Sequence, residues 1–213
     1  MKKLLATIPA LLLTVSVHAE DGKRLYGGFE YGVTRIDDNA AEVASIYVAA
    51  LGGSARVTQD ASAGVGRVFF GYRLTPQTAF EGGYFSSQTF GYRVSGTTSG
   101  AAAYTSVLDI DYSGVDAALV WSPMAVKNGD SGFYLKAGAH SSEVESTWSI
   151  TGAGGTLSLA AKETGTGMLF GAGYDWRFSD AAFVRAGATR YLRLAGDSDN
   201  KATVYSVAFG LDF

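Results

Sequence analysis

Residues 205–213 read Tyr205-Ser-Val-Ala-Phe-Gly-Leu-Asp-Phe213, and this stretch decides the fold because apolar side chains alternate strictly with small or polar ones. In an extended chain every second side chain points to the same face, so the repeat predicts a β-strand with one apolar face. The apolar positions are Tyr205, Val207, Phe209, Leu211 and Phe213. We therefore expect the chain to close on a strand whose apolar face runs its full length.

Seven segments upstream of this strand show the same alternation, and turn-forming residues separate them. In the first, Phe29, Tyr31 and Val33 share one face, and Glu30 lies on the other. Together with the terminal strand they predict eight strands. The seven upstream segments are residues 25–36, 63–74, 78–92, 105–121, 132–145, 164–178 and 182–194.

The segment 105–121 changes its phase part of the way along. Leu108, Ile110 and Tyr112 occupy even positions, whereas the apolar residues from Val115 onward occupy odd positions. One extra residue in a strand would shift the alternation in this way, so the pattern predicts a β-bulge near Ser113 and Gly114.

The connections between the eight segments alternate in length, which supports the strand count independently. Long loops at one end and short turns at the other are typical of transmembrane barrels, in which the long loops are extracellular and the short turns periplasmic. An even number of strands then leaves both termini in the periplasm. At one end lie residues 37–62, 93–104, 146–163 and 195–202, and at the other lie 75–77, 122–131 and 179–181, which are all shorter than the first three of the long set.

A closed barrel explains why each strand has two opposed faces. Lipid would meet one face, and every backbone N–H and C=O group at membrane depth needs a partner within the protein. Closure alone removes the unpaired edges of a sheet. The sequence therefore predicts an all-β protein, an eight-stranded antiparallel up-and-down transmembrane β-barrel.

The chain resembles the small eight-stranded outer-membrane barrels of the OmpA, OmpX and opacity-protein group, the outer membrane protein β-barrel domain family. Residues 71–84, 132–138, 171–178 and the terminal strand carry this resemblance, which covers essentially all of the chain after residue 19. It implies a location in the cell outer membrane of a Gram-negative bacterium. It also implies that the barrel-assembly machinery reads the terminal strand through the residues Tyr205, Val207, Phe209, Leu211 and Phe213.

The first 19 residues have the pattern of a secretory signal peptide. Lys2 and Lys3 precede an apolar run from Leu4 to Val17, and a small-x-small cleavage site ends at Ala19. We expect residues 1–19 to be removed and residues 20–213 to form a single barrel domain.

Composition excludes several classes of protein. The chain has no cysteine, so an exported form cannot rely on disulfides. Its formal net charge is −3, and removal of Lys2 and Lys3 with the signal peptide makes it −5, which disfavours nucleic acid as a partner. We find no pattern of metal ligands and no phosphate-binding loop, and we expect no cofactor.

The inner face of the predicted barrel carries three acids and five bases. An eight-stranded barrel is just wide enough for side chains to fill it, so these charges have to pair with one another. We expect an ion-pair network centred on Glu81, either as a structural polar core or as a gate in a narrow ion path. The residues are Glu30, Arg67, Arg73, Glu81, Lys136, Asp175, Arg177 and Arg185.

One cluster is a candidate for catalysis. His140 and Ser142 share a strand face, and Glu143 and Glu145 follow. This arrangement is similar to the His-x-Ser pair of outer-membrane lipid A deacylases, in which an acid orients the histidine and the histidine activates the serine. The alternation places His140 inward, away from lipid, so we interpret it as a rim histidine and expect no enzyme activity.

The long loops are the remaining candidates for function. Residues 37–62 contain Val43, Ile46, Tyr47, Ala50 and Leu51 at helical spacing, and residues 146–163 contain Trp148, Ile150, Leu157 and Leu159. Apolar residues on loops often mark contact surfaces, although these stretches could equally be extensions of the strands.

We expect a structural envelope role or an adhesin-like surface interaction. The alternatives are a narrow porin-like channel and, more remotely, a lipid A-modifying enzyme. The expected partners are outer-membrane lipid and lipopolysaccharide, the barrel-assembly machinery, and a host or surface ligand bound by the extracellular loops.

Overall fold

The computed structural model describes residues 24–35, 40–60, 62–125 and 130–213. The predicted signal peptide lies outside these residues. No helix in the described ranges is long and apolar enough to cross a membrane. The elements in chain order are β1 (Leu25–Arg35), α1 (Ala40–Leu51), β2 (Ser54–Gln59), β3 (Ser62–Arg73), β4 (Thr78–Ser87), β5 (Phe90–Thr97), β6 (Ala103–Trp121), β7 (Gly132–Gly152), β8 (Gly155–Ser179), β9 (Ala182–Leu192), the 3₁₀ turn η1 (Leu194–Gly196) and β10 (Lys201–Asp212).

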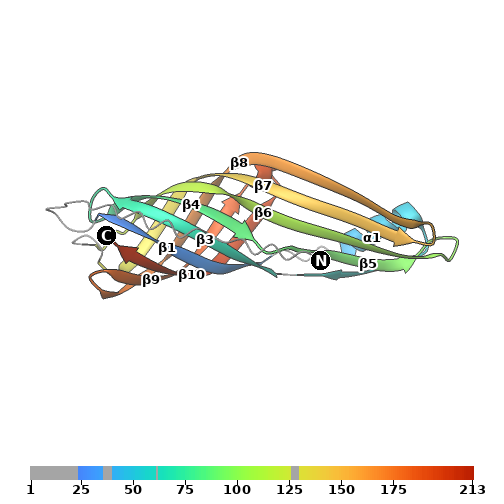
Figure 1. The fold of residues 1–213 in the computed structure, drawn as a ribbon, viewed down its shortest axis with the longest axis horizontal. Helices are drawn as coiled ribbons and strands as arrows, with labels where there is room; N and C mark the ends of the chain where they lie inside the picture. The colour runs from blue at the N-terminus through green and yellow to red at the C-terminus, as the bar shows by residue number, and fades with distance from the viewer. Residues whose placement is uncertain (1–23, 36–39, 61, 126–129) are drawn as a thin grey trace.

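Eight of the strands form a closed antiparallel ring (Figure 1). The ring runs β1-β3-β4-β6-β7-β8-β9-β10, and it closes because β10 pairs back onto β1. In this pairing Phe29 faces Phe209 and Val33 faces Tyr205. The predicted eight-stranded, up-and-down antiparallel barrel is confirmed.

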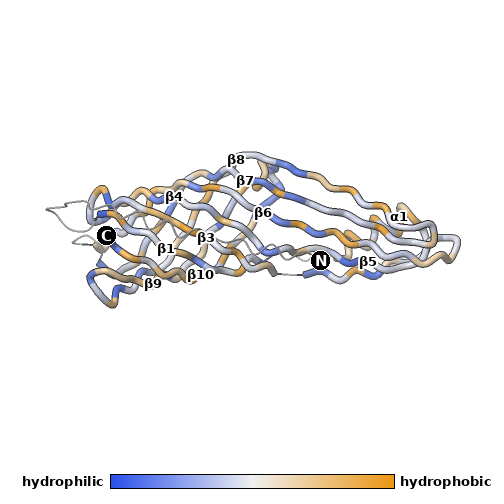
Figure 2. Tube along the Cα trace, in the orientation of Figure 1, coloured by the Kyte–Doolittle hydropathy of each residue, from blue (hydrophilic) through white to orange (hydrophobic). Residues whose placement is uncertain are grey.

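Apolar and polar residues alternate along the ring strands (Figure 2), and the exposed apolar residues form a belt on the outer face of the ring. The alternating residues of the terminal strand all point outward into this belt, and Phe213 is 60% exposed at its end. Seven of the eight ring strands, all except β9, contribute large exposed apolar side chains to the belt, as expected for a barrel whose outer face meets lipid. Its large members include Phe29, Tyr31, Val33, Val68, Phe70, Phe80, Tyr84, Val115, Leu119, Trp121, Phe133, Leu135, Met168, Phe170, Trp176, Tyr205, Val207, Phe209 and Leu211.

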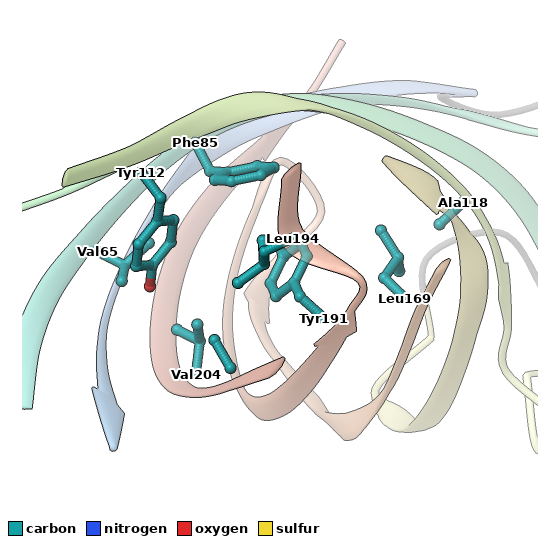
Figure 3. Packing of buried hydrophobic residues seen from close by; sticks show 9 residues of the cluster. Val65, Phe85, Tyr112, Ala118, Leu169, Tyr191, Leu194 and Val204 are labelled. Atoms are coloured by element: carbon teal, nitrogen blue, oxygen red, sulfur yellow. The ribbon is translucent and has the colours of Figure 1, made fainter. Parts of the chain in front are cut away.

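Two apolar clusters fill the two ends of the barrel interior. The cluster near the short turns surrounds Tyr26, Phe69 and Phe183. The cluster near the long connections surrounds Phe85 and Tyr191, whose ring centroids are 5.0 Å apart (Figure 3). Charged side chains occupy the zone between the clusters, so the barrel has a packed core.

An arm extends from one end of the barrel along the long axis of the molecule (Figure 1). We define the arm as α1, β2, β5 and the distal parts of β6, β7 and β8, residues 103–113, 141–152 and 155–166. Strands β7 and β8 stay paired up to Gly152 and Gly155. Residues 146–163 are therefore an extended β-hairpin, which was one of the two readings that the sequence left open.

The structure corrects two boundaries. The third predicted strand, residues 78–92, divides into β4 and β5, so the predicted loop 93–104 begins as a strand. The first predicted loop, residues 37–62, contains α1 and β2. These strands and the helix belong to the arm, where long-range pairing with β6 gives structure to segments that lack a membrane-facing pattern.

The predicted bulge at Ser113 and Gly114 is wrong. Strand β6 pairs with β7 without a break from Tyr104 opposite Gly152 to Trp121 opposite Leu135. The apolar side chains change from the outer to the inner face because β6 leaves the belt. On the arm side of Ser113, toward the start of β6, the apolar side chains point inward. The irregularity lies instead in the segment that joins β4 to β5 on the other side of β6. From Ser86 to Phe90 this segment covers four residue steps, whereas the paired residues of β6, from Ser113 to Ile110, cover three.

The register predicts that the arm can be shortened without loss of the barrel. Ser146 and Ala161 face each other, so an Asn-Gly turn can replace residues 147–160 between them. We expect the shortened protein, like the full chain, to migrate differently on SDS gels before and after boiling, because the ring pairings below this point remain. Loss of the shift would mean that barrel closure requires the arm.

Candidate functional site

The centre of the barrel interior is Glu81 on β4, whose side chain is completely buried. Its Oε1 lies 2.9 Å from Nη1 of Arg67, and its Oε2 lies 2.7 Å from Nη1 of Arg185. The Tyr26 hydroxyl donates a third hydrogen bond of 3.2 Å to Oε2. A single carboxylate thus joins strands β1, β3, β4 and β9 across the lumen.

Arg67 links Glu81 to two further acids. Its Nε and Nη2 donate to the two oxygens of Asp116 on β6, at 2.8 and 2.7 Å, in a bidentate pair. Its Nη1 also contacts Glu30 at 3.1 Å. Glu30 in turn accepts a hydrogen bond from Ser206, and Lys136 interacts with Glu30 electrostatically from β7.

Arg185 extends the network toward the short turns. It donates hydrogen bonds of 2.8 and 3.1 Å to Asp175 on β8. Its guanidinium carbon lies 4.5 Å from the centre of the Tyr134 ring, within the range of a cation–π contact. The apolar cluster at this end therefore packs directly against the charged layer.

A second ion-pair group lies at the end with the short turns. Asp212 on β10 pairs with Arg73, at 2.6 Å between Oδ1 and Nη1, and with Arg177. Arg73 also lies over the Tyr26 ring, 4.6 Å from its centre. Tyr26 contacts both groups and so connects this pair to Glu81.

All eight predicted interior charges lie in these two groups or beside them, and two further acids complete them. Asp116 and Asp212 were missing from the sequence prediction. With them, the inward-facing charges of the described ring strands number five acids and five bases. Both acids lie at positions where the alternation points inward. The predicted set of three acids and five bases was unbalanced, and this imbalance could have indicated that two inward acids were missing.

The turn end of the interior leaves little free space. The cavity at the turn end, lined by Tyr26, Arg73, Asp175 and Arg185, has a volume of about 30 Å³. This volume is close to that of one water molecule. The geometry is that of a structural polar core in which the arginines and acids pair at hydrogen-bond distance.

The His140 and Ser142 pair does not form a catalytic arrangement. His140 Nε2 lies 3.0 Å from the backbone oxygen of Leu192, and Ser142 Oγ accepts a 2.9 Å hydrogen bond from the backbone N–H of Ala195. Both side chains hold the connection between β9 and β10 in place. Glu143 points to the opposite face of β7, and Asp116, which lies opposite His140 on β6, is paired with Arg67.

Glu143 and Glu145 form surface ion pairs instead. Lys162 on β8 lies 2.6 Å from Glu143 and 3.2 Å from Glu145 on β7. The hydrogen bonds that Lys162 donates to these two carboxylates raise its pKa. In the ranges that the structure describes, no three acidic or histidine side chains are grouped to hold a metal ion.

Tyr47 fixes α1 to the inner face of the arm. Its hydroxyl lies 2.8 Å from Ser106 Oγ on β6 and accepts a 2.8 Å hydrogen bond from Nε1 of Trp148 on β7. Its ring stacks on Tyr104, with centroids 6.1 Å apart and planes inclined by 7°. The apolar residues of the two predicted loops therefore meet in one place.

The outermost part of the arm contains a groove, which we call the tip groove. It has a volume of about 430 Å³ and lies between the end of α1 and the β7–β8 turn, with walls from Leu51, Tyr104, Ile150 and Leu157. Leu157 and Leu159 are 56% and 58% exposed on the same face of β8. Apolar side chains are thus presented to solvent on an ordered frame.

The network predicts a large loss of stability for Glu81→Ala. Two buried guanidinium groups would lose their shared carboxylate, and breaking a buried ion pair costs about 3–5 kcal/mol. We expect a lower urea midpoint for unfolding in detergent. Glu143→Ala breaks only the exposed pair with Lys162 and should leave the midpoint nearly unchanged. Equal midpoints for Glu81→Ala and the unaltered protein would show that the network does not stabilise the barrel.

Comparison with solved structures finds small outer-membrane barrels. The Ail protein of Yersinia pestis is 14% identical, with a TM-score of 0.47, and the match covers 90% of this chain and 99% of Ail. The N-terminal barrel domain of Pseudomonas aeruginosa OprF is 13% identical, with a TM-score of 0.46 and coverage of 91% and 100%. OprG of the same organism is 14% identical, with a TM-score of 0.45 and coverage of 91% and 98%.

No curated protein sequence matches the chain. The profile of the family described as "Outer membrane protein beta-barrel domain" matches residues 5–213, which is nearly the whole chain. The alternating strands, the closed ring and the outward apolar belt agree with this match. The chain belongs to the outer membrane protein β-barrel domain family.

Proposed function

We propose that this protein is a sealed, non-enzymatic outer-membrane barrel that carries a surface-recognition arm. The observation that supports this function best is the ordered arm, whose helix is fixed to the sheet through Tyr47 while Leu157 and Leu159 remain exposed. A purely structural barrel has no need of an apolar surface on a rigid extension in water.

In this proposal the arm is extracellular and both termini are periplasmic. The connections at the end opposite the arm are short, as at Thr75–Gln77, and short turns are typical of the periplasmic side. Outer-membrane lipid and lipopolysaccharide surround the belt. The assembly machinery engages the outward residues of the terminal strand during insertion.

The charge of the arm favours a polypeptide partner over an anionic glycan. Its described residues include six acids and three bases, so a sulfated or phosphorylated chain would be repelled. An apolar side chain of a protein partner fits the tip groove, which is neutral in its lining. The charged arm residues are Glu42, Asp109, Asp111, Glu143, Glu145, Glu163, Arg56, Arg93 and Lys162.

Two substitutions test the recognition surface. Leu157→Ser with Leu159→Ser should reduce adhesion of cells that carry the protein to immobilised matrix proteins at least tenfold, because both exposed anchors are lost. Thr156→Ala with Ser158→Ala changes the opposite face of the same strand and should leave adhesion unchanged. The recognition role would be refuted if the two double variants adhered equally well. Retention on heparin in place of protein would contradict the partner class.

The sealed interior predicts an absence of ion conduction. Charges with fixed partners and a cavity of about 30 Å³ at the turn end argue against the alternative of a narrow channel. Purified protein in planar bilayers should give no discrete conductance steps at moderate voltage. Reproducible steps in the unaltered protein that disappear on removal of Glu81 would favour the channel instead.

A further inference from the structure

Three basic side chains gather on the outer surface of the barrel, at the end that carries the arm. Arg35 ends β1, Arg190 lies near the end of β9, and Lys201 begins β10, which runs between those two strands. Thr203 on β10 pairs with Arg35 on one side and with Arg190 on the other. The three basic side chains are exposed. We call Arg35, Arg190, Lys201 and Thr203 the rim cluster.

The arginine on β9 leans toward the arginine on β1. Arg190 Nη1 donates a 2.6 Å hydrogen bond to Thr203 Oγ1, which places its guanidinium group over the middle strand. Neighbouring strands are about 4.8 Å apart, so the Cα atoms of Arg35 and Arg190 are separated by roughly 10 Å. Both arginine side chains can therefore contact one ligand outside Thr203. Because the threonine oxygen is the acceptor in its bond with Arg190, its own hydroxyl proton is available to that ligand.

The rim cluster lies directly beside the apolar belt. The adjoining outward residues of β10 and β1 are Tyr205 and Val33, which are 60% and 46% exposed. On β9 the adjoining outward residues are Ala188 and Ala186, which pair with Tyr205 and Val207. Tyrosine is typical of the boundary between lipid and water. A lipid whose acyl chains pack against the two alanines would therefore hold its headgroup at the rim cluster.

Charge is distributed unevenly around this end of the barrel. On the outward faces of the described strands β1, β9 and β10, no side chain is acidic. The outer faces of β6 and β7, on the opposite side of the ring, carry four acids, and Lys162 pairs with two of them. These acids are Asp109, Asp111, Glu143 and Glu145. An anionic headgroup is therefore attracted to the rim cluster and repelled from β6 and β7.

We propose that the rim cluster binds a phosphate monoester on the headgroup of a membrane glycolipid of the lipid A type. Arg35 and Arg190 donate N–H groups to the phosphate oxygens, as guanidinium groups do in phosphate sites, and Lys201 contributes a third positive charge. A phosphate monoester carries about −1.5 to −2 charges at pH 7, which matches three cations better than the single charge of a phosphodiester lipid. That this lipid lies in the outer leaflet rests on the orientation of the arm proposed above.

Diphosphorylated lipid A is the probe for this site. Isotopically labelled protein in phosphatidylcholine nanodiscs with increasing lipid A content should give saturable NMR shifts of the Arg35 and Arg190 Nε–H signals. The Nε–H signal of Arg56, on the outer face of the arm, is the internal reference and should not shift. Lipid A without its phosphate groups should bind at least tenfold more weakly, because the charged hydrogen bonds are lost.

Matched variants identify the residues that bind the lipid. Arg35→Gln and Arg190→Gln should each weaken lipid A binding about tenfold, measured from the Thr203 amide signal, since each variant loses one charged hydrogen-bond donor. Arg56→Gln with Arg93→Gln removes two exposed charges from the arm and should bind normally. The gel shift on boiling verifies that each variant is folded.

Four results would overturn the proposal. Unchanged affinity of Arg35→Gln and Arg190→Gln would place the lipid elsewhere on the barrel. Equal affinity for lipid A without phosphate would mean that the acyl chains alone bind. Saturable shifts with inorganic phosphate at the same concentration would indicate a site for the free anion, and equal affinity for phosphatidylglycerol would show that a single negative charge suffices. None of these results bears on adhesion by the tip groove, which Leu157→Ser with Leu159→Ser tests separately.

Discussion

The shared carboxylate of Glu81 is the interaction on which the rest of the barrel depends. Closing eight strands around a narrow lumen forces every inward charge to find a partner within side-chain reach, because water cannot screen it there. Glu81 binds Arg67 and Arg185 at the same time, and each arginine then recruits a further acid. The five acids and five bases together carry no net charge, and the apolar clusters on either side of the central group can exclude water from it.

The apolar residues of the same alternating strand occupy opposite faces inside and outside the belt. Along β6, the odd residues Val115 and Leu119 face lipid, whereas the even residues Ile110 and Tyr112 face the interior of the arm. The two-residue repeat continues without interruption, but the solvent on the outer face changes from lipid to water. A change of phase in hydropathy thus marks where a strand leaves the membrane, and a bulge is not needed to explain it.

The sequence was sufficient for features that depend on the local repeat. The eight strands and the face on which each charged residue lies follow from the alternation of the sequence. The arm could not be predicted in the same way, because β5 is a strand only through its pairing with β6, and α1 is placed by the contacts of Tyr47 with Ser106 and Trp148. These contacts join residues about 60 to 100 positions apart, and no local pattern reports them.

The pair that most resembled a catalytic site, His140 and Ser142, has a structural role instead. A histidine and a serine two positions apart on a strand suggest proton transfer, yet His140 and Ser142 are both used to restrain the connection after β9. That restraint keeps Leu194 turned inward in spite of the unfavourable backbone on either side of it. Strain of this kind persists only where the surroundings over-determine a conformation. Polar side chains that take no part in the ion-pair network therefore shape the mouth of the barrel.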